Sequence, residues 1–345
     1  MRRQRNTGAV VETPKTPAGP VTLSKEKPTL EEAKNFYITE RVSGSEFAQK
    51  KRKTRLAAMM RQVSEALGGD VPALSDWTID HAYKVRDFLL SKKGIKPSTV
   101  RRDLNDLRGV FSLYKDKKLR SMDNPFAGLE LPKSLISDKE VRDALPDDVV
   151  TATRKLIIEN ANPDLKAIWR LLEGTGCRLA EITGLRVQDI STEGGTPHIK
   201  IVAHEARQLK NASSKRDVPL VGDALAIAKE IVGAAKDNTY AFPRYSGPTG
   251  PNTASQSLMK WLRKVTDNPL HAVHSLRHNM ADRCDLAGVH PTDKEAILGH
   301  LNVSASEKHY GSEAAKRVRL KRAMERACGL NAPSVDSAQD GRVIA

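Results

Sequence analysis

The feature of this sequence that most restricts its fold is a set of short polar motifs that recur in a fixed order through its second half. In chain order they are Thr175–Leu185, His274–His278, Leu298–His300 and Tyr310. Within them, Arg178 and Arg277 can each offer a guanidinium fork to the non-bridging oxygens of a phosphodiester, and a tyrosine can attack phosphorus as a covalent nucleophile. A fold that joins these segments in one pocket would be able to cut DNA without a metal ion.

Each of these residues also has a simpler interpretation. An isolated histidine on a helix is more often structural than functional. Arg178 and Glu181 would by default form an exposed i,i+3 ion pair worth roughly a few tenths of a kcal/mol, and Tyr310 is one of six tyrosines. His274 and Arg277, however, share one helical face, and a Gly-His pair and a tyrosine follow in order. This joint spacing favours one common site over several unrelated structural roles.

The motifs resemble those of the tyrosine recombinase (phage integrase) catalytic domain. That family carries, in this order, an Arg in a T-G-x-R-x-x-E box, a Lys on a β-hairpin, an H-x-L-R-H box, an L-G-H box and a nucleophilic Tyr, and all five have counterparts here. The resemblance covers residues 147 to 325 and, more loosely, residues 28 to 130. It implies an enzyme that cuts and rejoins DNA through a 3′-phosphotyrosine and needs no cofactor.

The resemblance gives a role to each motif residue. Arg178 and Arg277 would clamp the phosphate, and His300 would donate to a non-bridging oxygen. His274 would take the tyrosine proton or hold an oxygen. Tyr310 would attack phosphorus in line and leave a free 5′-hydroxyl on the other side of the break.

Three further roles follow from the same resemblance. The leaving 5′-oxygen needs a general acid, and Lys210 occupies the lysine position of the hairpin, with Lys215 as the alternative. Glu181 would orient Arg178 or a neighbouring imidazole. His278 would support the site without touching substrate.

Composition agrees with a nucleic-acid partner. The chain has 345 residues, a net charge of +15 and a pI near 9.7, and strongly basic chains favour DNA, RNA or anionic surfaces. Its apolar stretches are too short to span a membrane, which requires about 18 residues. The three scattered cysteines fit a reducing cytoplasm, and CxxC, HExxH and P-loop motifs do not occur, so we expect neither a metal nor a nucleotide cofactor.

Hydrophobic periodicity predicts a mainly α-helical chain with a small antiparallel β-sheet. Strand-like alternation occurs at 187–190, 198–203 and 216–220. The length favours two domains. The expected parts are a flexible basic arm (1–27), a helical core-type DNA-binding domain (28–131), a linker (132–146), the α+β catalytic domain (147–328) and a loose tail (329–345).

Basic side chains outside the motifs are candidates for DNA contact. In the helical domain they lie opposite the apolar face of the helix that begins near Pro97, and in the catalytic domain they lie on the hairpin. The candidates are Arg101, Arg102, Arg108, Lys215 and Arg216. The alternative for any of them is a solvated charged face, since exposed helix faces are usually charged.

These observations predict a site-specific recombinase, in the cytoplasm at the nucleoid, that integrates or excises a phage or another mobile element. The alternatives are a Xer-like chromosome resolvase, a type IB topoisomerase and a non-catalytic DNA-binding regulator that uses Arg178–Leu185 in a helix-turn-helix. The expected partners are double-stranded attachment sites, a homotetramer on DNA and accessory DNA-bending or directionality proteins. Residues from about Arg317 to Ala345 would contribute to a protomer contact, or else fold onto their own domain.

Overall fold

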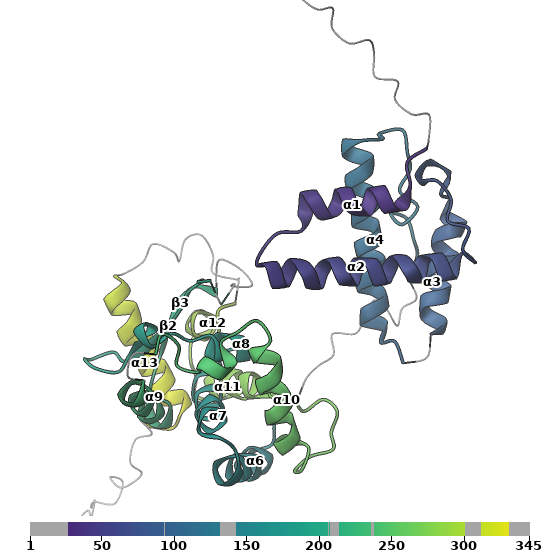
Figure 1. Cartoon of the computed structure of the whole chain (residues 1–345). Coiled ribbons are helices and arrows are strands. Elements are labelled where there is room, and N and C mark those ends of the chain that lie inside the picture. Colours follow the sequence, from purple (N-terminus) through teal and green to yellow (C-terminus); the bar gives the residue numbers. More distant parts are fainter. Residues whose placement is uncertain are drawn as a thin grey trace, which may run out of the picture. The chain divides into compact units, whose positions relative to one another are not determined.

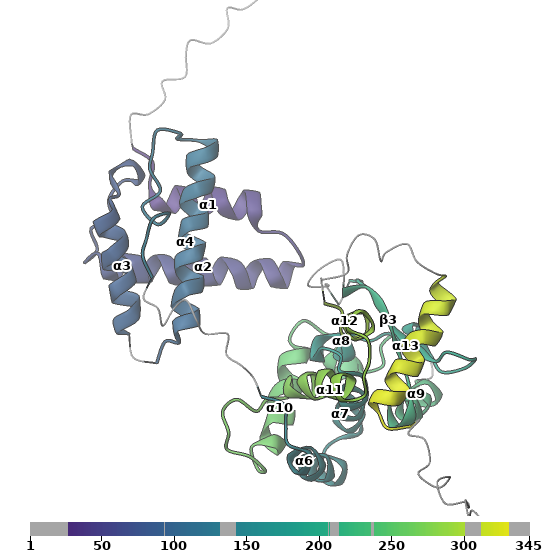
Figure 2. The ribbon, with the colours of Figure 1, turned by 180° about the vertical axis from the view of Figure 1, so that it is seen from behind.

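The computed structural model describes residues 27–92, 94–131, 143–205, 207, 214–235, 238–300 and 312–330. They form two compact units, whose main boundary falls within 132–142, outside the described residues (Figures 1 and 2). Each unit has its own hydrophobic core. Helices dominate and one small antiparallel sheet is present, so the predicted fold class is confirmed. The limits of the predicted arm, linker and tail fall largely outside the described ranges and stay predictions.

The first unit is helical. Its helices are α1 (Leu30–Arg41), α2 (Glu46–Ala66), α3 (Ile79–Ser91) and α4 (Pro97–Lys117), with a 3₁₀ turn, η1 (Leu74–Asp76). Thr29 caps α1, where it forms a capping box with Glu32. Helix α4 has Lys96 as its N-cap residue, and Pro97 takes the first helical position, where proline is favoured.

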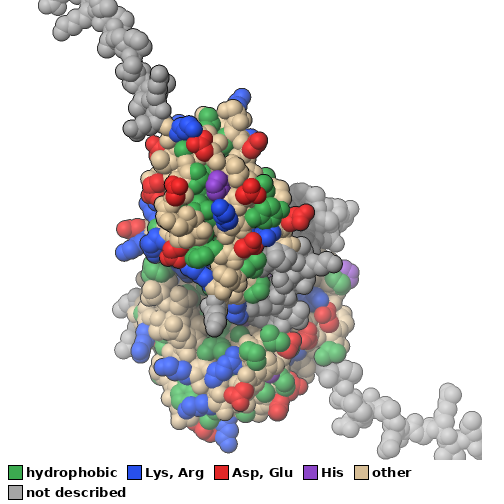
Figure 3. Space-filling model, turned by 90° about the vertical axis from the view of Figure 1, so that its right-hand side faces the viewer, with side chains coloured by type: hydrophobic (Ala, Val, Ile, Leu, Met, Phe, Trp, Pro, Cys, Tyr) green, Lys and Arg blue, Asp and Glu red, His purple; other side chains and the backbone are tan. Residues whose placement is uncertain are grey.

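Helix α4 supports the core of this unit with the apolar stripe that the sequence predicted. The stripe is buried at Val100, Leu104, Leu107, Val110 and Phe111. Arg101 and Arg102 lie on its exposed side. Arg108 is half-buried and its Nε donates to the carbonyl of Phe126 at 2.8 Å, so this side chain holds the end of the unit. Basic and acidic side chains are interspersed on the face shown in Figure 3.

The second unit consists of helices and one small sheet. Its helices are α6 (Asp147–Asn160), α7 (Pro163–Thr175), α8 (Leu179–Thr183), α9 (Gly222–Ala234), α10 (Gly250–Leu262), α11 (Ser275–Leu286), α12 (Pro291–Leu298) and α13 (Glu313–Ala327), with 3₁₀ turns η2 (Val187–Asp189) and η4 (Pro243–Tyr245). The strands β1 (Ile190–Ser191), β2 (His198–Ile201) and β3 (Arg216–Pro219) pair antiparallel in the order β1-β2-β3. Ile199 lies opposite Val218, and both side chains are buried.

Two glycines allow α7 to pack closely on its neighbours. A Cβ at Gly174 would lie 2.8 Å from the Cβ of Ala224 on α9, and one at Gly176 would lie 2.7 Å from the Cβ of Met280 on α11. Gly176 ends the helix in the left-handed region, at φ 63°, where glycine is favoured. The turn that leads to Arg178 therefore begins at Gly176, because Gly174 is still helical.

Helix α13 packs against its own unit. Its buried side chains, Leu320, Ala323, Met324 and Ala327, belong to the core of that unit. Arg317 pairs with Asp217 of β3 at 3.0 Å, and Arg319 pairs with buried Asp293 of α12 at 2.8 Å. The alternative of a helix folded onto its own domain thus holds for α13. Val318 is 40% exposed, and 331–345 lie outside the described residues, so the protomer contact stays a hypothesis there.

No described helix has both the length and the apolar composition required to cross a membrane.

Candidate active site

The end of α7 and the start of α8 place the first motif arginine. After Gly176 the chain turns, and Arg178 becomes the N-cap residue of α8. Its Nη1 donates to Glu181 Oε1 at 2.9 Å, and its backbone N–H donates to Glu181 Oε2 at 2.8 Å. The Arg178 side chain is 24% exposed. The guanidinium is therefore anchored through one edge and can still present donors to a ligand.

Glu181 is a buried carboxylate shared by two arginines. Its side chain is 7% exposed and accepts from Arg178 and from Arg216, whose Nη1 and Nη2 lie 3.1 and 2.9 Å from the two oxygens. Burial alone would raise the pKa of this carboxyl. The hydrogen bonds and positive charges of Arg216 and Arg178 outweigh burial and lower the pKa to about 2. Glu181 thus holds the guanidinium groups of Arg178 and Arg216 side by side.

The second motif arginine, Arg277, lies on the buried side of α11. Its Nη1 donates to the carbonyl of Gly176 at 3.0 Å, and its Nη2 donates to the carbonyl of Leu298. Burial, followed by the charges of Arg178 and Arg216, lowers the pKa of Arg277 to about 10. It therefore remains charged at neutral pH. Its two bonds tie the T-G-C-R turn to the L-G-H turn.

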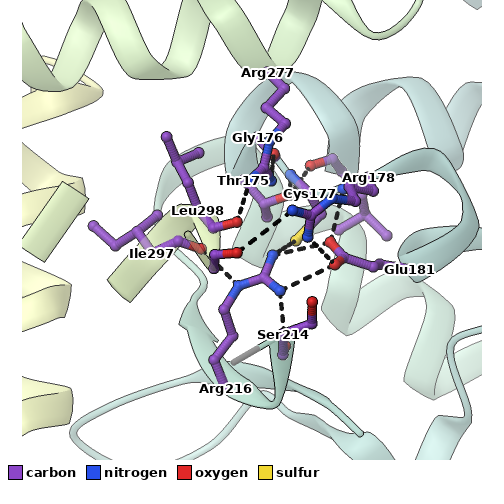
Figure 4. A network of polar contacts seen from close by, with 12 residues as sticks. Thr175, Gly176, Cys177, Arg178, Glu181, Ser214, Arg216, Arg277, Ile297 and Leu298 are labelled. Carbon is purple, nitrogen blue, oxygen red and sulfur yellow. Dashed lines mark hydrogen bonds and ion pairs between the residues drawn. The ribbon is translucent and has the colours of Figure 1, made fainter. Parts of the chain in front are cut away.

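The C-terminal end of α12 is the point where the motifs meet (Figure 4). Three consecutive carbonyls there accept from three different arginines: Ile297 from Arg216 at 2.8 Å, Leu298 from Arg277, and Gly299 from Arg178 at 3.4 Å. Carbonyls at a helix end lack intrahelical partners and carry partial negative charge. Guanidinium groups satisfy both needs, and in doing so they gather around the turn that precedes His300.

The two box histidines differ in setting. His300 is exposed, and its backbone N–H donates to the carbonyl of Glu295 at 3.0 Å. The pKa of His300 is lowered, mainly by partial burial and next by the positive charges of Arg277, Arg178 and Arg216. The lowered pKa favours a neutral imidazole. His274 is the half-buried N-cap residue of α11, and its ring meets that of His278 edge to face, with centroids 5.5 Å apart.

The hairpin residues divide between the surface and the interior. Lys215 is exposed just before β3. Arg216, which we expected to contact DNA, has a side chain that is only 6% exposed and that donates to groups inside the protein. Its burial removes it from the set of surface contacts. The neighbouring residues in the chain do not indicate this inward role, because its partner Glu181 is distant in the sequence.

Two expected catalytic residues lie outside the described residues: Lys210 and Tyr310. The described structure brings together Arg178, Arg277 and the turn before His300. Across the described ranges, His, Cys, Asp and Glu side chains form no group suited to hold a metal ion. The arrangement can bind an anionic tetrahedral group with guanidinium donors.

The helix-turn-helix alternative does not fit this region. Helix α8 has only five residues and is followed by η2 and β1, not by a second helix. The Arg178–Leu185 segment therefore has no recognition helix to place in a DNA groove.

Residues 146–317 match the model of the Phage integrase family. This chain belongs to the phage integrase family of tyrosine recombinases. It is therefore a DNA strand-exchange enzyme. Curated relatives include the tyrosine recombinase XerC of Neisseria meningitidis serogroup C (strain 053442), 23% identical over 266 residues that cover 73% of this chain and 83% of the relative. XerC of Vibrio parahaemolyticus serotype O3:K6 is 25% identical over 300 residues, covering 85% and 90%.

Solved structures of integrases have the same fold. The Tn1549 transposon integrase in complex with a circular intermediate DNA matches with a TM-score of 0.62 and 18% identity, over 86% of this chain and 99% of that one. The lambda integrase tetramer bound to a Holliday junction matches with a TM-score of 0.55 and 17% identity, over 82% and 78%. The predicted family and fold are thus confirmed.

Proposed function

We propose that this recombinase cuts and rejoins double-stranded DNA at specific sites through a 3′-phosphotyrosine on Tyr310, and so integrates or excises a phage or another mobile element. The observation that carries the proposal is the shared anchoring of Arg178 and Arg277 on the turn that precedes His300. Two guanidinium groups hydrogen-bonded to the turn that precedes His300 can bind a phosphodiester. Donors fixed in place before the reaction stabilise its negative charge.

The proposed chemistry is a transesterification. The Tyr310 hydroxyl gives its proton to His274 and attacks phosphorus, forming a phosphotyrosine bond while the bond from phosphorus to the 5′-oxygen breaks. Lys210, or alternatively Lys215, supplies the proton to the leaving 5′-oxygen. Arg178 and Arg277 hold the non-bridging oxygens throughout. Attack by the 5′-hydroxyl of another strand reverses these steps, so rejoining needs no energy source.

A nicked substrate tests this chemistry directly. On such DNA the cleaved fragment diffuses away, and a covalent protein–DNA adduct accumulates. Tyr310→Phe should abolish the adduct and leave DNA affinity nearly unchanged, because only the nucleophilic oxygen is lost. Tyr240→Phe is the matched control, since the Tyr240 hydroxyl donates to Glu205 at 2.7 Å and should leave the adduct intact. A normal adduct yield from Tyr310→Phe would refute the assignment.

The proposed assembly is a homotetramer on two DNA sites. One active site cuts one strand, whereas exchange between two duplexes requires four cuts. The lambda integrase tetramer bound to a Holliday junction supports this stoichiometry for a protein of the same fold. Accessory DNA-bending or directionality proteins would complete the complex at the nucleoid. Exposed Arg101 and Arg102 are the proposed backbone contacts of the first unit.

A second candidate function is chromosome dimer resolution, because curated relatives of this chain are XerC recombinases. Recombination assays distinguish the two. Integration predicts strand exchange between two different attachment sites, whereas resolution predicts exchange between two identical sites on one replicon. A non-catalytic regulator would form no adduct with either substrate.

A further inference from the structure

Arg216 uses every donor it has on groups inside the catalytic unit. Its Nε binds the carbonyl of Ile297 at 2.8 Å, and its Nη1 binds the carbonyl of Ser214 at 3.0 Å and Glu181 at 3.1 Å. Its Nη2 binds Glu181 at 2.9 Å and lies 3.8 Å from Cys177 Sγ. A guanidinium has five N–H donors, and these five contacts occupy all of them, as Figure 4 shows.

These contacts connect three motif boxes that are far apart in the chain. Through Glu181, Arg216 fixes the carboxylate that orients Arg178. Through the Ile297 carbonyl, it holds the last turn of α12, which precedes His300. Its own place at the first residue of β3 ties both to the strand that follows the hairpin lysine.

The L-G-H box is shaped to admit this side chain. A Cβ at Gly299 would lie 2.8 Å from Arg216 Nη1 and 3.1 Å from its Cζ. Gly299 also has φ 69°, a conformation that favours glycine. The glycine of the box thus has two functions, which are to end α12 and to leave room for the guanidinium.

We propose that Arg216 is a positioning residue for strand cleavage: it sets where Arg178 and the turn before His300 lie, and links both to the hairpin. The inference rests on the proposed function, because it concerns the same site. Lysine would not replace it, since an ammonium has three donors and no planar fork. Without Arg216, Glu181 would stay buried beside Arg178 alone, and the Ile297 carbonyl would lose its partner.

Cleavage and binding by Arg216→Lys and Arg216→Gln test the proposal. Adduct formation on the nicked substrate should slow by about tenfold to a hundredfold, by analogy with the loss seen when the hydrogen-bond partner that orients a metal ligand is removed. DNA affinity should stay near that of the wild type. The matched control is Arg170→Gln, which removes another arginine fork of the same unit, on Asp223, without touching a motif residue. Its cleavage should be normal.

The pH profile separates positioning from a general loss of packing. Glu181 faces Arg178 and Arg216, with Cys177, Arg207 and Arg277 near enough to interact electrostatically. In the wild type its pKa, at about 2, keeps it ionised throughout the assay range. In Arg216→Gln that pKa must rise. The cation that lowers it most is gone, and burial, which raises it, remains. The cleavage rate relative to wild type should then fall as pH decreases from 8 to 5.

Adding Glu181→Gln to Arg216→Gln removes both members of the ion pair, so no unpaired buried carboxylate remains. This double variant should fold even if Arg216→Gln does not, should cleave slowly, and should show no such pH dependence relative to wild type.

Wild-type cleavage from either Arg216 variant, or from the folded double variant, would overturn the proposal. So would a relative rate that is independent of pH in Arg216→Gln, or a loss confined to DNA affinity. Absence of an adduct from the wild-type protein would instead refute the proposed function, so the two failures are distinguishable.

Discussion

Replacing Glu181 with glutamine should cost the catalytic unit about 3 kcal/mol at neutral pH. The carboxyl pKa falls from 4.5 to about 2 in the folded protein, and each pKa unit corresponds to about 1.4 kcal/mol. The side chain is 7% exposed, so solvent screens these interactions little. Because the folded-state pKa is lowered, this stabilisation is present above pH 4.5 and is lost as pH falls towards 2. At pH 3 about 1.4 kcal/mol of it should remain.

Calorimetry of the full chain measures this cost. The two compact units should give separate transitions, so the N-terminal unit serves as an internal reference. For a unit of this size, 1 kcal/mol shifts the unfolding temperature by about 2–4 °C. Glu181→Gln should therefore lower the unfolding temperature of the catalytic unit by about 6–12 °C at pH 7 and by less than half as much at pH 3.

Glu230→Gln is the control, since Glu230 is 63% exposed and pairs with Arg170 only at 3.4 Å. Exposed pairs of this kind contribute little, so neither transition should move. An equal shift from Glu181→Gln at both pH values would show that charge is not the source of the stabilisation. No shift at pH 7 would show that the arginines find other partners at no cost.

Four further outcomes are expected. Gly176→Ala should lower the second calorimetric transition by the equivalent of about 1–3 kcal/mol, because its Cβ would lie 2.7 Å from that of Met280 at φ 63°. Arg277→Ala should slow single-turnover cleavage by about a hundredfold or more; a loss below about tenfold would argue against its clamp role. DNA affinity, measured by fluorescence anisotropy, should fall steeply between about 50 and 200 mM salt. Deleting residues 1–26 should leave nicked-substrate cleavage intact, since Lys27 already pairs with Asp76 of the first unit at 2.8 Å.

The sequence predicted helices well where an apolar stripe repeats. In α4 the stripe from Val100 to Phe111 is buried as expected. In α2 the first turns, from Glu46, are rich in Lys and Arg and carry no apolar stripe, so periodicity does not indicate a helix there. The predicted strand at 187–190 is mostly the turn η2, with only Ile190 and Ser191 in β1. In this turn the amide of Val187 donates to the carbonyl of Thr239 at 3.0 Å, a contact between segments distant in the chain.

The candidate site was predictable as a set of residue types but not as a set of contacts. Arg178 and Arg277 could be named from their motifs, and Glu181 lies one turn from Arg178. Arg216 could not be distinguished from an exposed hairpin arginine, because its carboxylate partner Glu181 is not near it in the chain. The space that admits it is a missing Cβ at Gly299, and only the folded structure shows that relation.

The contacts of Arg216 limit which segments of this enzyme can be exchanged with those of its relatives to make a chimera. A hairpin transplanted from another integrase would bring its own residue in place of Arg216, but would meet Glu181 and Gly299 of the host. A side chain without a fork would leave a buried anion, and a host without the glycine would exclude the fork. Arg216, Glu181 and Gly299 therefore form one interdependent set, and a functional chimera must take all three from the same parent.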